Sequence, residues 1–139
     1  MTGQRKLTFV QVQSAMKVMI DKSLEIPEIP TAMAVVDEGG HLLAYATMDG
    51  LNLFAREHII RKTYTAAITG KDSAAHADAR REMGITVAEL GDPNLSAVGG
   101  GVVIRSPEGY ILGAIGAGGY PSGQADEDLA RLGLKAMNL

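Results

Sequence analysis

The sequence predicts an α+β domain built around one antiparallel sheet. Two pairs of short apolar segments are each joined by a tight-turn sequence, and a short turn connects antiparallel strands. Segments with helical periodicity stand before, between and after the two pairs. Because such helices need an apolar face to cover, we expect them to lie on the sheet.

The first predicted helix begins after Thr8 and ends before Pro27. A threonine side chain can accept a hydrogen bond from a free backbone N–H at a helix start, whereas proline ends a helix. The apolar residues between them recur at helical spacing and form one stripe: Val12, Ala15, Met16, Met19 and Ile20. A helix with one apolar stripe is expected to cover a sheet.

The first strand pair is predicted at Ala32–Val36 and Leu42–Thr47, inside two apolar runs. The connecting sequence, Asp37 to Gly40, ends in two glycines, which adopt the positive φ of a tight turn at little cost. This segment is therefore expected to be a hairpin.

The middle of the chain is predicted to be helical. One helix is expected over Phe54–Thr69, and a second from Asp72 or Ser73 to Met83, each followed by a glycine that can end it. The sequence Thr86–Glu89 fits a capping box for one further turn.

The second strand pair is predicted at Val102–Arg105 and Ile111–Ala117, around a turn that contains proline and glycine. A fifth strand is expected near Leu95–Val98. The last helix is expected over Gln124–Met137, with acidic residues in its first turns and basic residues later, as the helix dipole favours.

Composition indicates a single domain over residues 1–139. Hydrophobic residues make up 46% of the chain and charged residues 21%, which is enough apolar material for a buried core. The helices and strands carry more alanine, valine, isoleucine, methionine and glycine than a monomer of this size readily covers, so we expect a homo-oligomer.

Several classes of partner are disfavoured by charge and residue type. Acidic residues outnumber basic ones, 16 against 13, which argues against nucleic acid. No signal peptide or membrane span is indicated, so a cytoplasmic location is expected. The chain has no cysteine, and its three histidines lack zinc-site spacing, so no metal site is predicted.

Six motifs, in order, carry a resemblance to a known family: Ala34–Ala44, Met48–Gly50, Lys62–Ala67, Gly99–Arg105, Gly113–Gly119 and Gln124–Asp128. Their order resembles the GlcG/HbpS family, which also occurs as the C-terminal domain of PduO-type proteins. The resemblance runs from about Thr8 to Met137. It implies a profilin-like fold, with an antiparallel sheet of about five strands flanked by helices, and a tendency to form homo-oligomers.

A candidate pocket is predicted where motif residues and ionisable groups coincide. His58 and Lys62 lie four residues apart on one predicted helix, and Asp49 lies in the turn before it. We assign proton-carrying or catalytic roles to Asp49, His58 and Lys62. The ligand-binding residues are expected to be Met48, Gly50, Arg56, Gly99, Gly100 and Gly101, completed across a subunit boundary. Replacing Lys62 with alanine is expected to weaken a carboxylate-bearing ligand and leave the melting temperature nearly unchanged.

Each part of this pocket also has a structural interpretation. The cationic helix face can be a solvated surface. The glycines of Gly99–Gly101 and Gly116–Gly119 can expose backbone N–H groups to an anion or permit close packing of strands and subunits. The acidic residues Asp126, Glu127 and Asp128 oppose a phosphate at the nearby helix start.

The ligand is expected to be a small molecule. The resemblance implies haem or a related tetrapyrrole as a candidate, because family members are linked to haem binding or degradation, corrinoid metabolism and catabolic operons. The axial donors available are His41, His58, His76, Met48 and the tyrosines, and spacing singles out none of them. The alternative is a catabolic enzyme that transfers a proton or hydrolyses a carboxylate-bearing intermediate, with Lys62 or Arg56 binding the carboxylate.

Overall fold

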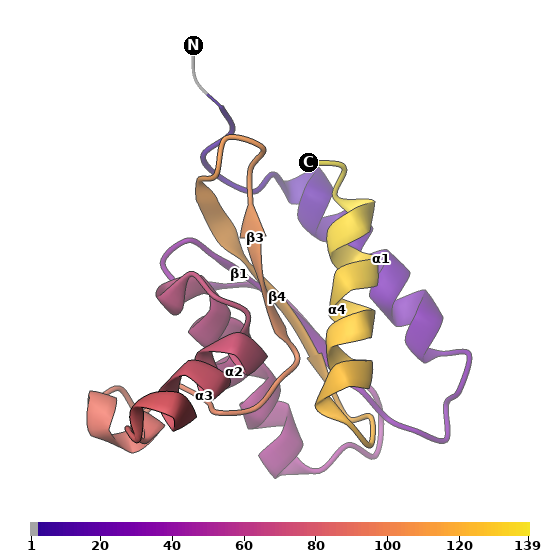
Figure 1. Cartoon of the computed structure of the whole chain (residues 1–139). Coiled ribbons are helices and arrows are strands. Elements are labelled where there is room, and N and C mark those ends of the chain that lie inside the picture. Colours follow the sequence, from indigo (N-terminus) through magenta and orange to yellow (C-terminus); the bar gives the residue numbers. More distant parts are fainter. Residues whose placement is uncertain (1–2) are drawn as a thin grey trace.

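The computed structural model describes residues 3–139. Within this range the chain forms four strands, four α-helices and one short 3₁₀ turn (Figure 1). Their bounds are α1 Phe9–Ser23, β1 Ala32–Asp37, β2 Leu42–Thr47, α2 Leu53–Thr69, α3 Ser73–Met83, η1 Val87–Leu90, β3 Gly101–Arg105, β4 Ile111–Gly118 and α4 Gly123–Ala136. None of these helices has the length and hydropathy needed to cross a membrane.

The strands form one antiparallel sheet in the order β2-β1-β4-β3. Both predicted hairpins are present, and β1 and β4 join them by pairing along their length, with Ala34 opposite Gly116. The α+β class predicted from the sequence is therefore confirmed, with helices on both faces of the sheet.

The fifth strand predicted near Leu95–Val98 is wrong, since this segment has no strand conformation in the described structure. Two of its backbone N–H groups donate to side-chain hydroxyls, and the N–H of Leu95 donates to the Asp92 carbonyl at 3.2 Å. The N–H of Ser96 donates to the Thr65 hydroxyl at 2.8 Å, and the N–H of Val98 donates to the Ser96 hydroxyl at 3.4 Å. The segment is thus attached to α2 rather than to the sheet.

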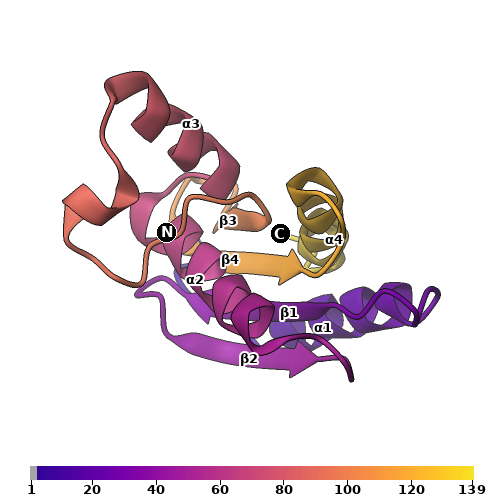
Figure 2. The same ribbon diagram turned by 90° about the horizontal axis from the view of Figure 1, so that it is seen from below.

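The sheet separates two helical layers. Figures 1 and 2 show α1 and α4 on one side of the sheet and α2 with α3 on the other. Along β1 the side chains alternate between the two layers: Met33 and Val35 belong to the larger core with α1 and α4, whereas Ala34 packs near Ile59 of α2. The small side chains on the α2 side allow this helix to lie close to the sheet.

Two glycines bring α2 particularly near the strands. A Cβ atom at Gly101 of β3 would collide with the backbone carbonyl oxygen of Lys62, and one at Gly116 of β4 would collide with the Thr63 hydroxyl. The close-packing interpretation of these glycines therefore has direct support in the structure.

The capping box expected at Thr86–Glu89 does not form, since the Thr86 side chain makes no cap hydrogen bond. The predicted further turn is present as η1.

Candidate functional site

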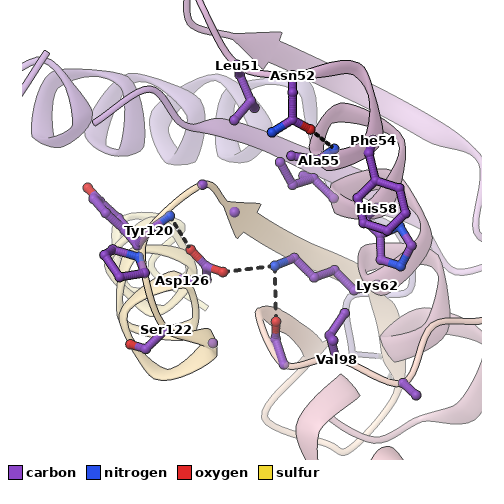
Figure 3. A pocket seen from close by; sticks show the side chains of 17 residues that line it. Leu51, Asn52, Phe54, Ala55, His58, Lys62, Val98, Tyr120, Ser122 and Asp126 are labelled. Atoms are coloured by element: carbon purple, nitrogen blue, oxygen red, sulfur yellow. Dashed lines mark hydrogen bonds and ion pairs between the residues drawn. The ribbon is translucent and has the colours of Figure 1, made fainter. Parts of the chain in front are cut away.

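A cleft of about 550 Å³ opens at the end of β4, between the first turns of α2 and α4. Its walls come from the N-terminal part of α2, from residues 97–99 and from residues 118–123, with Asp126 of α4 (Figure 3). The volume falls within the range of small-molecule sites. It is the candidate functional site.

Both helices that border the cleft begin with a side-chain cap. Asn52 accepts a hydrogen bond from the N–H of Ala55 at 2.8 Å, and Ser122 accepts one from the N–H of Ala125 at 3.1 Å. Both caps line the cleft, so the positive ends of two helix dipoles border it.

A buried ion pair borders the cleft. The Lys62 ammonium donates to the Asp126 carboxylate at 3.1 Å and to the Gly99 carbonyl at 3.0 Å (Figure 3). The other oxygen of Asp126 accepts the Tyr120 backbone N–H at 3.0 Å. Lys62 is 5% exposed and Asp126 is 6% exposed. The pair connects α2 to α4, which lie on opposite faces of the sheet.

Burial moves both members of the pair towards neutrality. It lowers the pKa of Lys62, against the opposing charge and hydrogen bond of Asp126. It raises the pKa of Asp126, against the opposing effects of Lys62 and the Tyr120 N–H. Proton transfer between Nζ and Oδ2 is therefore less unfavourable than it is in an exposed lysine–aspartate pair.

Glycines make room for the ammonium group. A Cβ atom at Gly100 would lie 2.5 Å from Lys62 Nζ, and one at Gly118 would lie 3.0 Å from it. A larger residue at either position would displace the ammonium or close that end of the cleft. Gly100 also has φ +124°, which favours glycine.

His58 lies on the α2 wall, one helical turn before Lys62. Its ring stacks on Phe54 with centroids 4.4 Å apart. Burial lowers the pKa of His58, and the positive charges of Arg61 and Lys62 lower it further. Neither ring nitrogen has a hydrogen-bond partner within residues 3–139, so the neutral imidazole has a nitrogen available to a ligand.

The structure brings three of the predicted site residues into the cleft: His58, Lys62 and Gly99. Gly100 and Gly101 lie directly behind it, against Lys62. The glycine run Gly99–Gly101 and the side chains of His58 and Lys62 therefore lie together at this cleft.

The other predicted site residues lie outside this cleft. Arg56 borders a separate hollow with Tyr45 and Thr47. The Met48 sulfur accepts a hydrogen bond from the Thr31 hydroxyl at 3.2 Å. Asp49 and Gly50 are exposed in the turn before α2. The structure therefore separates them from His58 and Lys62, although all were predicted to form one pocket.

Asp126 is a site residue that the sequence analysis does not identify. The sequence groups it with Glu127 and Asp128 as acids that oppose a phosphate, and the structure shows it buried as the partner of Lys62. A signal was present, because Asp126 precedes Leu129, Ala130 and Gly133 at spacings of three, four and seven, and these are buried residues of α4. Helical periodicity thus places Asp126 on the inward face.

This chain is a small α+β domain, with an antiparallel sheet between two helical layers and a cleft bordered by the starts of α2 and α4. Residues 7–135 match the family model described as haem degrading protein HbpS-like. The chain belongs to this family, which confirms the resemblance found in the sequence.

Solved structures show the same fold. The HbpS crystal structure is 26% identical, with TM-score 0.81, covering 97% of this chain and 92% of that chain. Klebsiella pneumoniae protein ORFY is 21% identical, with TM-score 0.83 and coverages of 99% and 94%. The PduOC:Heme complex is 20% identical, with TM-score 0.83 and coverages of 96% and 96%. No curated protein sequence matches the chain.

Proposed function

We propose that the cleft binds haem or a related tetrapyrrole, with His58 as the nitrogen donor to iron. The observation that carries this proposal is the unpartnered His58 imidazole in the wall of a ligand-sized cleft. Family membership supports it, as does the haem held by PduOC, which has the same fold.

The residues present fit such a group. The neutral form of His58 is the form that binds iron, and Leu51, Phe54, Ile59 and Val98 supply apolar surface for a macrocycle. Bound haem supplies an iron atom for ligand binding or redox chemistry. The protein's part is to hold the iron through His58 and to exclude water with the apolar wall.

Haem titration tests the proposal. The wild-type protein is expected to give a saturable Soret band, and His58→Ala is expected to bind haem about tenfold or more weakly, as befits a lost metal contact. His41→Ala is the matched control, because His41 is an exposed turn histidine that bonds to Asp37. Equal haem affinity in His58→Ala and wild type would assign the iron to another donor.

A catabolic enzyme that uses the same cleft is the second candidate. The observation that favours it is the buried Lys62–Asp126 pair, because perturbed acid–base groups in a cleft are typical of catalytic sites. If the pair transfers protons, small carboxylic acids with an acidic C–H should exchange hydrogen for deuterium in D₂O. Proton NMR measures this exchange, and Asp126→Asn is expected to abolish it.

We also propose that the protein is a homo-oligomer. Several large apolar side chains are strongly exposed, including Phe9 at 79%, Leu53 at 74% and Phe54 at 73%. The last two lie on or beside the cleft rim, so a second subunit there would bury the rim. Light scattering is expected to give at least twice the chain mass of 14.6 kDa. A monomer at micromolar concentration would contradict this expectation.

A further inference from the structure

We propose that Lys62 forms a reversible imine with small carbonyl compounds that enter the cleft. This inference deepens the second candidate function by naming the reacting atom and the chemical class of substrate, and it rests on the cleft being a ligand site. It is independent of haem and of His58.

The position of the Lys62 nitrogen supports this chemistry. It lies in the cleft wall, and it makes two hydrogen bonds to the described residues, to Gly99 and Asp126. An ammonium has three N–H groups, so one position remains for a ligand atom. Gly100 and Gly118 place no side chain over it.

Asp126 is close enough to accept the proton that the Lys62 ammonium must lose before it reacts. A lysine reacts with a carbonyl only as the free amine, and desolvation in an apolar cleft is one way in which proteins activate it. The 3.1 Å contact gives the ammonium proton a direct route to the Asp126 carboxylate. Burial, which lowers the pKa of Lys62 and raises that of Asp126, favours this transfer.

The reaction balances without any further reactant. After Lys62 gives its proton to Asp126, the amine lone pair forms a C–N bond with the carbonyl carbon, and a proton moves from nitrogen to the carbonyl oxygen. The Asp126 carboxylic acid then protonates the hydroxyl group. Water leaves as the C=N bond forms, and Asp126 is again a carboxylate. The net change is an ammonium plus a carbonyl giving a protonated imine plus water.

Reductive trapping tests the proposal on the full chain. Pyruvate and propionaldehyde, in separate reactions at neutral pH, are combined with the protein and cyanoborohydride, which reduces an imine to a stable amine. Peptide mass mapping is expected to find Lys62 labelled faster than the exposed Lys17, despite its burial. The two compounds distinguish a keto-acid site, labelled by pyruvate, from an aldehyde site, labelled by propionaldehyde.

Two controls test whether the labelling of Lys62 depends on the folded site. In urea-unfolded protein the preference for Lys62 should disappear, and Lys17→Arg should leave Lys62 labelling unchanged. If surface lysines are labelled in the folded protein and Lys62 is not, Lys62 does not form an imine and the proposal is wrong, whereas proton transfer by the pair is still decided by the deuterium-exchange experiment. That result would leave the haem proposal intact, because haem titration is read from a different signal and a different residue.

Discussion

Replacing Lys62 with methionine is expected to lower the free energy of unfolding by about 3–5 kcal/mol, the usual effect of removing one partner from a buried ion pair. Methionine fills much of the same space, so the loss is mainly electrostatic. Asp126, which is 6% exposed, would keep the Tyr120 N–H as its remaining donor. This replaces the expectation from sequence alone, in which removal of Lys62 left the melting temperature nearly unchanged.

Urea unfolding measures this change in the free energy of unfolding, and two further variants serve as controls. Adding Asp126→Leu to Lys62→Met removes the stranded carboxylate and should restore most of the lost stability. Lys17→Met breaks the solvent-exposed pair with Asp21 and should lower stability far less than Lys62→Met does. A Lys62→Met loss as small as that of Lys17→Met would show that the buried pair is not needed for stability.

Changing Gly101 to alanine is expected to cost about 3 kcal/mol, at the upper end of the effects of overpacking. The new methyl group would meet the backbone carbonyl oxygen of Lys62. A helix backbone cannot rotate aside as a side-chain end can, so α2 would have to move away from β3. Thermal and urea unfolding of the purified variant measure the loss.

Gly123→Ala is the matched control for this substitution. Gly123 lies in the first turn of α4, and the nearest atoms to an added Cβ would be 3.6 Å away, an ordinary contact distance. Its expected effect is within about 1 kcal/mol of zero. Equal stability of the two alanine variants would mean that α2 does not depend on a glycine at position 101.

The hairpins could be predicted because the residues that form each turn are neighbours in the sequence. The glycines after Asp37 and the proline and glycine after Ser106 define turns regardless of the rest of the chain. The conformation of Leu95–Val98 depends instead on the hydrogen bond from the Ser96 N–H to Thr65, which lies 31 residues before Ser96 in the chain. No local pattern contains that contact, and the apolar residues alone favoured a strand.

The residues of the candidate site that could be predicted from the sequence are His58 and Lys62 of α2, together with Gly99. His58 and Lys62 share a face at a spacing of four, and they do meet in the cleft. Arg56 precedes His58 by two residues, about 200° around a helix, so periodicity places it on another face. The partner of Lys62 lies 64 residues away. Helical periodicity places Asp126 on the inward face of α4, but no local pattern pairs it with Lys62.

The Lys62–Asp126 pair also affects how easily α2 and α4 separate at the cleft. It holds α2 to α4 around the end of β4, where Gly100 and Gly118 provide no side-chain contacts. In native-state fluctuations, separation of α2 from α4 at this end would therefore require the buried ion pair to break. A ligand that engages either charge would change how often the helices separate, so occupancy of the cleft and the local dynamics of the sheet end would be thermodynamically linked.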